Sequence, residues 1–360
     1  MKIYNFSAGP SCLPESVLES VSKASKNFQN SGMSIMEISH RSELIVDLFE
    51  NTTLRLRKIL NVPDNYHILW LQGGASMQFA MVPLNLLGQK KSADYIETGI
   101  WSSKAILECN KVGKANVIAS SKDSKFTFIP REYEQNIESE YLHITSNNTI
   151  YGTQYKVIPN VENPNGFLVA DMSSEILSKP LDVSNYGLIY SGAQKNMGPA
   201  GVTLVIIRED LVGRNYRDLP TMLDYKTHVS KDSMFNTPPV LSVFAVNETL
   251  KWIESIGGIT EMEKINNRKA QSLYDEIERN SLFFSPINKD DRSMMNVPFI
   301  FKDTTINESE FLSYCHSHGL MALKGHRSVG GFRASIYNSM PEAGVNALIS
   351  AMQEFEKMGQ

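Results

Sequence analysis

Cysteine is scarce in this sequence, which contains only Cys12, Cys109 and Cys315 among its 360 residues. The three are far apart, odd in number and never arranged as C-x-x-C, so neither a disulfide framework nor a zinc knuckle is supported. We therefore expect reduced thiols. His316 and His318, two positions apart in YCHSHG, would point to opposite sides of a helix, which argues against a metal site there. The sequence predicts no metal site.

Long apolar runs and a surplus of positive charge are also lacking. No window reaches the length of a membrane span, and the opening MKIYNFSAGPSCLPE has no continuous apolar stretch of the kind found in signal peptides. The formal net charge is -4 and no basic stripe is present, so a nucleic-acid surface is not indicated. We expect a cytoplasmic globular protein. Small acidic metabolites are not excluded as ligands, because local charge can oppose net charge.

The order of apolar patterns along the chain is typical of α/β architecture. Helices are expected near 14–28 and 43–60, where apolar residues recur with helical spacing. Short apolar runs bounded by turn residues predict strands at 67–71, 167–171, 188–190 and 202–207. The chain therefore predicts a large domain built on a mostly parallel sheet.

A second domain is expected after the pair Gly257 and Gly258, which ends a helical pattern. Thr260 and Glu263 then offer a capping box for the next helix. Beyond this point MNVPFIF and FRASIY read as strands, and a final helix keeps one apolar face. We predict an N-terminal segment, 1–15, packing with the small domain, a large α/β domain, 16–257, and a small C-terminal α+β domain, 258–360.

One lysine, Lys195, stands in the turn SGAQKNMGPAG between two apolar runs that read as core strands. Asp171 ends the apolar run FLVAD, and ligands of open α/β sheets bind at such carboxyl ends. One crossover fits between the two residues, which places a carboxylate and an amine at neighbouring strand ends. A plain salt bridge is one alternative. A helix N-cap is another for Asp171.

Gly73 and Gly74, in GGASMQF, make a tight turn between a strand and a helix, where free backbone N–H groups and the Ser76 hydroxyl form an anion site. The two common nucleotide fingerprints are absent, and a plain turn is the alternative. Trp101 is suited to stack on a flat ring or to fill the core. Thr149 lies beside a turn that its hydroxyl would otherwise cap.

Taken together, these features fit pyridoxal phosphate. This cofactor needs a lysine amine, an acid beside its pyridine nitrogen, an anion cradle for its phosphate and a face that stacks on its ring. Six segments carry a resemblance to the phosphoserine aminotransferases, a family of class V, fold-type I pyridoxal-phosphate enzymes. They are SAGPSCLP, MEISHR, GGASMQF, SGAQKNMGPAG, SMFNTPP and GHRSVGGFRASIYN. The resemblance runs from Asn5 nearly to the C-terminus. The substrate is inferred from this resemblance and not from the spacing of the residues.

The resemblance implies a role for each matching residue. Lys195 becomes the Schiff-base lysine and Asp171 the partner of the pyridinium nitrogen, while Trp101 stacks on the ring. The cofactor and its phosphate are also lined by Ala75, Ser76, Thr149 and Gln194. Some members carry an arginine in place of Ser76, which helps to hold the substrate there. Two further residues resemble those that reach the cofactor phosphate from the second subunit of a homodimer, namely Asn236 and Thr237.

A substrate with a carboxylate at one end and a phosphate at the other needs two cationic clamps, which guanidinium groups serve well. By resemblance, Arg333 takes the α-carboxylate. The phosphate, or the side-chain carboxylate of glutamate, is faced by His40, Arg41, His326 and Arg327. Without the resemblance, any one of these arginines would be interpreted as an ordinary surface residue.

The resemblance implies a homodimeric transaminase of serine biosynthesis that reversibly converts phosphoserine and 2-oxoglutarate to 3-phosphohydroxypyruvate and glutamate. A phosphorylated hydroxythreonine of vitamin B6 synthesis is a second implied substrate. The nearest rival is another class V enzyme, such as an alanine–glyoxylate aminotransferase or a desulfurase. Cys315 lies in an apparent amphipathic helix and reads as a buried thiol, which argues against a mobile nucleophilic cysteine. A rival of another kind is a non-catalytic phosphometabolite-binding protein.

Overall fold

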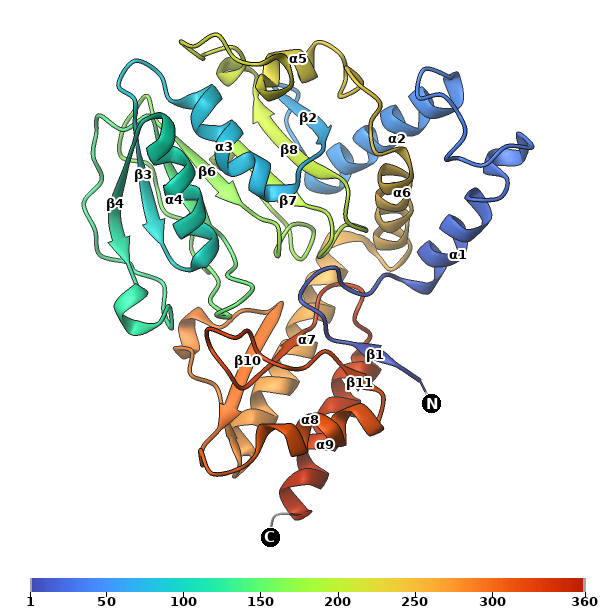
Figure 1. The fold of residues 1–360 in the computed structure, drawn as a ribbon, viewed down its shortest axis with the longest axis vertical. Helices are drawn as coiled ribbons and strands as arrows, with labels where there is room; N and C mark the ends of the chain where they lie inside the picture. Colours follow the sequence, from blue (N-terminus) through green and yellow to red (C-terminus); the bar gives the residue numbers. More distant parts are fainter. Residues whose placement is uncertain (1, 359–360) are drawn as a thin grey trace.

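The structure, a computed structural model, describes residues 2–358, and a seven-stranded sheet organises the larger part of it (Figure 1). Its strand order is β2-β8-β7-β6-β5-β3-β4. Strand β8 pairs antiparallel with both its neighbours, and every other pairing in this sheet is parallel. The strands are β2 (Tyr66–Leu71), β3 (Ser92–Glu97), β4 (Lys114–Ser120), β5 (Tyr141–Thr145), β6 (Phe167–Asp171), β7 (Leu188–Gly192) and β8 (Thr203–Arg208). The predicted mostly parallel sheet is confirmed.

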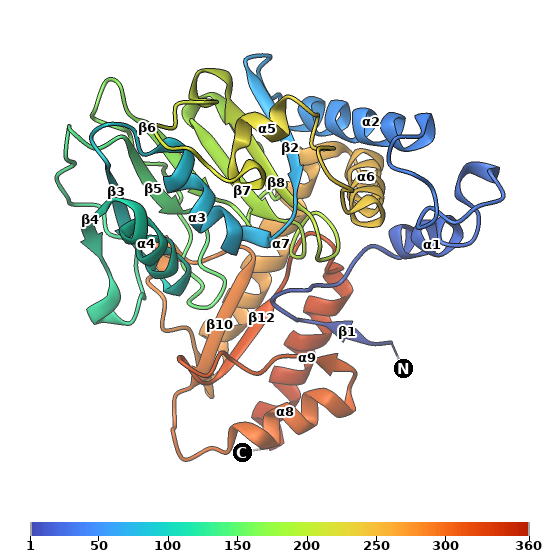
Figure 2. The same cartoon turned by 45° about the horizontal axis from the view of Figure 1, so that its top comes forward.

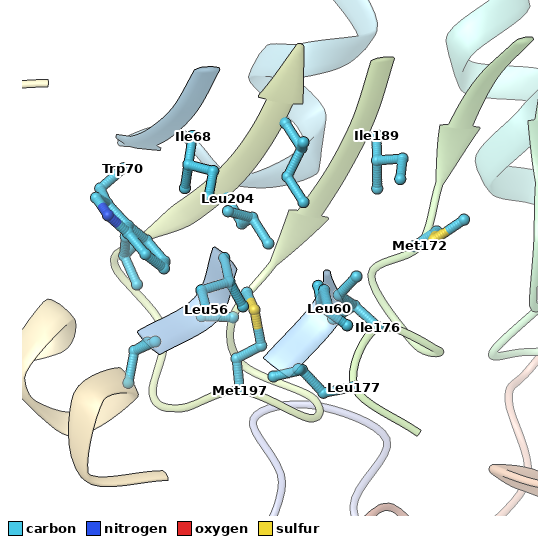
Figure 3. Close-up of a cluster of buried hydrophobic side chains, with 14 of the residues drawn as sticks. Leu56, Leu60, Ile68, Trp70, Met172, Ile176, Leu177, Ile189, Met197 and Leu204 are labelled. Atoms are coloured by element: carbon cyan, nitrogen blue, oxygen red, sulfur yellow. The ribbon is translucent and has the colours of Figure 1, made fainter. Parts of the chain in front are cut away.

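Helices cover both faces of this sheet, because its strands alternate apolar side chains toward two cores. On β8, Leu204 and Ile206 join the core that contains α2, whereas Val205 and Ile207 join the core that contains α3. Figure 3 shows the first of these cores, with Leu56 of α2 beside the sheet. The helices are α1 (Glu15–Ala24), α2 (Glu43–Leu60), α3 (Gly74–Leu86), α4 (Ile100–Val112), α5 (Tyr225–Val229) and α6 (Val240–Ser255).

A second unit lies below the large sheet in Figures 1 and 2 and has its own aromatic core. Phe283 packs against the rings of Phe299, Phe311 and Phe332 with centroids 4.9 to 6.0 Å apart. A three-stranded antiparallel sheet has the order β12-β10-β9. The elements are α7 (Gly258–Arg279), β9 (Phe283–Phe284), β10 (Asn296–Phe301), α8 (Glu308–Ser317), β11 (Leu320–Met321), β12 (Phe332–Ser335) and α9 (Glu342–Met358).

The beginning of the chain joins this second unit. Strand β1 (Tyr4–Asn5) pairs parallel with β11, and Phe6 is buried in the same aromatic core. The chain then runs past the large sheet before α1 begins (Figure 2). On this path, residues 8–11 lie at the junction between the two units, next to the connection between β7 and β8.

Two local expectations were wrong. The first helix ends at Ala24, and residues Phe28–Asn30 form a separate 3₁₀ turn. The capping box at Thr260 and Glu263 does not form, because α7 already begins at Gly258 with Gly257 as its N-cap. Both glycines have positive φ, 105° for Gly257 and 81° for Gly258. The chain therefore turns between α6 and α7 at these two residues, whose backbone conformation favours glycine.

The other 3₁₀ segments of the described residues are Lys122–Ser124, Val183–Asn185, Glu209–Leu211, Thr221–Leu223 and Lys289–Asp291. Within residues 2–358, no helix combines the length and the apolar character that crossing a membrane requires. The three cysteines are free thiols, and Cys315 is fully buried in α8 as expected.

Candidate active site

A cavity of about 480 Å³ lies at the junction of the two units, next to the carboxyl ends of the parallel strands. Its walls come from the 8–9 segment, the first turns of α3 and α4, the residues after β5, the end of β6, the β7–β8 connection and the segment from 326 to 333. Among the residues that line it are most of those predicted for the site: Ala75, Ser76, Trp101, Thr149, Asp171, Gln194, Lys195, His326, Arg327 and Arg333.

Lys195 extends into this cavity from the connection between β7 and β8, and only 9% of it is exposed. Its Nζ donates a hydrogen bond of 2.6 Å to the Thr149 Oγ1. The pKa of Lys195 is lowered to about 8, chiefly by burial; Asp171 acts in the opposite direction, and the Arg333 cation adds to the lowering. An amine of this kind is neutral in a larger fraction near neutral pH than an exposed lysine, which makes it a better nucleophile and proton acceptor.

The N-terminal segment holds Lys195 from the other side. Gly9 has φ of 140°, and a Cβ added there would lie 3.3 Å from the Lys195 Cγ. Ser11 donates its backbone N–H to the Gln194 carbonyl at 3.0 Å. A side chain at position 9 would therefore press on the lysine, so glycine is required for this close approach.

Asp171 ends β6 and is 5% exposed. It lies opposite Tyr190 of β7 in the parallel register, so the predicted placement of the carboxylate and Lys195 at neighbouring strand ends is confirmed. The Ser173 N–H donates to its Oδ1 at 2.9 Å, and burial raises its pKa. No α-helix begins between Asp171 and the start of β7, and within residues 2–358 no salt bridge joins Asp171 to Lys195. Asp171 is therefore neither the N-cap of a helix nor the partner of Lys195 in a plain salt bridge.

The turn between β2 and α3 is the glycine turn that the sequence predicted. Gly73 and Gly74 have φ of 88° and 66°, and a Cβ on Gly73 would come within 2.6 Å of the Met77 Cβ. Only glycine fits this turn. Helix α3 begins at Gly74, and Gly74, Ala75 and Ser76 line the cavity. Because the first N–H groups of a helix have no partner within it, they favour an anion at this wall.

Trp101 lies on the first turn of α4 and is partly buried. Its indole Nε1 is buried without a hydrogen-bond partner among the described residues. The Lys195 Nζ lies 5.8 Å from the ring centroid. A flat indole face at this distance from a lysine amine, with an unused donor at its edge, suits a planar ligand that carries an acceptor.

Cations from the smaller unit complete the cavity. Arg333, on β12, donates from Nη1 to the Thr149 carbonyl at 3.4 Å, and its Nε is buried without a partner in the part of the chain described. His326 and Arg327 lie in the loop between β11 and β12. Burial lowers the pKa of His326, and the nearby cations Arg333, Arg327 and Lys104 lower it further. The cavity is therefore lined by several cations, a composition that suits an anionic ligand, and the Lys195 amine lies among them.

Four predicted residues do not line this cavity. His40, partly buried, and Arg41, exposed, lie in the turn before α2. Asn236 and Thr237 are both exposed and precede α6, with the Thr237 carbonyl accepting a hydrogen bond of 2.9 Å from the Gln72 side chain. One chain by itself does not bring these four residues to Lys195.

Several lining residues were missed by sequence reasoning. Gly9 and Ala8 come from the segment SAGP, whose role could not be read without knowing where β1 pairs. Phe79 and Lys104 follow predicted site residues by one helical turn, and that spacing was the one available signal. Residues 2–358 contain no group of three or more His, Cys, Asp or Glu side chains that could hold a metal ion.

Comparison with known proteins places this cavity in context. Residues 3–348 match the model of the family described as aminotransferase class-V. The phosphoserine aminotransferase of Parabacteroides distasonis is 50% identical over 358 residues, covering 99% of either chain. The solved phosphoserine aminotransferase from Bacillus circulans subsp. alkalophilus has a TM-score of 0.96 and 43% identity, over 100% of this chain and 99% of that one.

A further similar solved structure contains PLP. It is the PLP-bound phosphoserine aminotransferase from Trichomonas vaginalis, with a TM-score of 0.92 and 37% identity. The match covers 98% of this chain and all of that one. The similarity thus extends over both units and over every wall of the cavity.

Proposed function

The chain belongs to the aminotransferase class-V family, and from this membership we propose that it transfers the amino group of phosphoserine to 2-oxoglutarate, reversibly and with pyridoxal phosphate as cofactor. One observation carries the proposal. A single cavity brings together a buried lysine amine, a buried carboxylate at the neighbouring strand end and guanidinium groups from the other unit. Each of these groups has a function in a transamination of a doubly anionic amino acid.

The donor set of the cavity fits pyridoxal phosphate. Lys195 would bind its aldehyde carbon, Asp171 would face its pyridine nitrogen and the indole of Trp101 would cover its ring. The first N–H groups of α3 and the Ser76 hydroxyl would hold its phosphate. When bound, the cofactor supplies an electron sink for the pair released as the α-proton leaves. Asp171 supports this chemistry because a carboxylate there favours a protonated ring nitrogen.

Lys195 has two tasks in this proposal. It would hold the cofactor between turnovers, and its freed amine would then transfer a proton, accepting it from the substrate α-carbon as a base and releasing it as an acid. Its lowered pKa, about 8, supports the first half of that transfer, because the neutral amine is the base. The hydrogen bond to Thr149 fixes the direction of Nζ.

The cationic residues divide between the two ends of the substrate. Arg333, which is held against the Thr149 carbonyl and close to Lys195, would bind the α-carboxylate. His326 and Arg327, in the loop between β11 and β12, would bind the distal phosphate or the side-chain carboxylate of glutamate. A planar guanidinium with paired donors suits either anion.

We further propose a homodimer with shared active sites. His40, Arg41, Asn236 and Thr237 lie outside the cavity of their own chain, and three of them are exposed. They would contribute to the site only from a partner subunit. The proposal assigns the phosphate of the cofactor to Asn236 and Thr237 of the partner subunit, and the distal anion of the substrate to the partner's His40 and Arg41.

The proposed setting is serine biosynthesis in the cytoplasm, where the three free thiols would stay reduced. The test is to purify the protein with pyridoxal phosphate, record its visible absorption and measure single-turnover half-reactions with phosphoserine, glutamate, alanine and serine. We expect a visible cofactor band and conversion of phosphoserine and glutamate. Preference for alanine or serine would favour another class V activity, and absence of the band would favour a non-catalytic binding protein.

A matched variant links this activity to the cavity. Lys195→Ala should fold, because the lysine makes a single side-chain hydrogen bond, but it should lose both the cofactor band and turnover. A phosphorylated hydroxythreonine presents the same distal phosphate as phosphoserine. It is therefore the second amino acid to test as a substrate.

A further inference from the structure

Lys104 is a cation of the cavity that has no assigned role. It lies on α4, three residues after Trp101, and its side chain reaches the cavity wall. Its Nζ lies 4.7 Å from the centroid of the Trp101 ring. Residues three positions apart share a helix face, so the indole and the ammonium are presented to the cavity together.

The ammonium of Lys104 has no anionic partner in the described part of the chain, in contrast to another lysine of the same helix. Lys111 pairs with Glu108 at 2.7 Å, whereas no salt bridge or side-chain hydrogen bond of Lys104 is present within residues 2–358. Its one side-chain interaction is the cation–π contact, which is weak at an exposed position and readily exchanged for an ion pair.

The charges of the cavity are unbalanced. Among the described residues that line it, Asp171 has the one carboxylate, against the cations Lys104, Lys195, Arg327 and Arg333. Lys104 also lies near enough to His326 to contribute, with Arg333 and Arg327, to the lowering of the histidine pKa. Like charges gathered in one cavity repel one another, and an anion bound between them removes that repulsion.

We propose that Lys104 is a further substrate-binding residue, whose ammonium contacts the distal phosphate from the large unit while His326 and Arg327 contact it from the small unit. This inference rests on the proposed function and names an additional specificity determinant of the same site. An ammonium on a flexible four-carbon chain is a mobile point charge suited to a phosphate dianion. A side-chain carboxylate carries half that charge, so phosphate gains more from it than glutamate does.

The test compares Lys104→Met, Lys104→Arg and the control Lys111→Met, whose exposed side chain lies two turns further along the same helix and pairs with Glu108. Half-reactions of the holoenzyme are followed at several concentrations of phosphoserine and of glutamate. We expect Lys104→Met to weaken phosphoserine binding by roughly tenfold or more, with a much smaller effect on glutamate. Lys104→Arg, which keeps the charge, should stay within about threefold of wild type. Lys111→Met should change neither.

Inorganic phosphate gives a second readout that does not depend on turnover. As a competitive ligand of the holoenzyme it should bind Lys104→Met more weakly than wild type, and Lys111→Met as tightly as wild type. Equal effects of Lys104→Met on phosphoserine and glutamate would mean that Lys104 only supports Trp101, and no effect would mean that it is ordinary surface. Either result overturns this inference and leaves the proposed function intact. Failure of the wild-type enzyme to convert phosphoserine would overturn the proposed function itself.

Discussion

The Lys195 ammonium donates a hydrogen bond of 2.6 Å to the Thr149 hydroxyl, across the gap between the β7–β8 connection and the residues after β5. Thr149 is 3% exposed, and its carbonyl also accepts a hydrogen bond from Arg333. One residue thus positions both the lysine and the arginine proposed for the α-carboxylate. The orientation of the two cations is set before any substrate arrives.

The first prediction concerns this hydroxyl. Thr149→Val keeps the shape of the side chain but removes the acceptor, so the lysine loses its fixed direction. We expect the half-reaction with either amino acid to slow by on the order of tenfold, the loss expected for one hydrogen bond to a charged group. Thr149→Ser keeps the hydroxyl and should retain most of the rate. If the valine variant matches wild type, the hydrogen bond has no part in the reaction.

The second prediction is a pH dependence. Burial lowers the Lys195 pKa to about 8, and the neutral amine is the form that attacks the cofactor aldehyde. The rate at which apoenzyme takes up pyridoxal phosphate should therefore rise with pH and level off above about pH 8. The neighbouring charges give opposite controls. Asp171→Asn removes the group that raises this pKa and should shift the midpoint down, whereas Arg333→Ala should shift it up.

A rate that continues to rise up to about pH 10 would be the behaviour of an ordinary exposed lysine, and would contradict the burial argument. A shift of the same sign in Asp171→Asn and Arg333→Ala would contradict the electrostatic argument. The uptake can be followed as the growth of the visible cofactor band. Melting temperatures measured at each pH separate uptake from unfolding.

Much of the fold could be predicted, because it depends on local pattern. Helix α2 was expected over 43–60 and spans Glu43–Leu60, and β6 spans the expected Phe167–Asp171. Both have strong apolar periodicity and clear turn residues at their ends. Strands β3, β4 and β5 of the large sheet were not predicted. The sequence of β4, KANVIAS, is half exposed at the sheet edge and lacks the apolar run of a buried strand.

Site residues that lie at the ends of predicted strands could be predicted from the sequence. Site residues on helices and loops were harder to predict. Asp171 and Lys195 follow directly from parallel neighbouring strands. Lys104 was missed, because its one signal in the sequence is that it follows Trp101 by about one helical turn. His40 and Arg41 resemble family residues but do not line the cavity of their own chain, and sequence does not tell which subunit a residue serves.

Asp171 is the subject of the third prediction. Asp171→Asn removes the charge that favours a protonated ring nitrogen, so the half-reaction rate should fall by on the order of a hundredfold. The melting temperature of the apoenzyme should not fall. Burial raises the folded pKa of Asp171 above its unfolded value, so its ionised form opposes folding above that pKa, and an amide oxygen can keep the bond from the Ser173 N–H.

Stopped-flow rates and thermal melts on the same preparations check both halves of this prediction. An unchanged rate would make Asp171 a structural residue of the turn after β6. A large drop in melting temperature together with a lost rate would point to the same conclusion.

The fourth prediction tests the shared active site. Lys195→Ala and Thr237→Asp should each be inactive, the second because a carboxylate would repel the cofactor phosphate of the partner subunit. Unfolding and refolding the two variants together should restore part of the activity, because the mixed dimer contains one intact site. Heterodimers verified by mass but without recovered activity would show that each site is complete within one chain.

The most direct measurement of the central claim compares two arginine variants with two substrates. Arg327→Ala removes a cation proposed for the distal anion, and Arg333→Ala removes the one proposed for the α-carboxylate. Loss of a guanidinium from a buried ion pair typically costs about 2–5 kcal/mol, part of it from the stranded partner. In single-turnover half-reactions, Arg327→Ala should lower kcat/KM for phosphoserine well beyond its effect on glutamate, whereas Arg333→Ala should harm both about equally. Equal losses with Arg327→Ala, or a wild-type preference for alanine or serine, would contradict the assignment of phosphoserine as substrate.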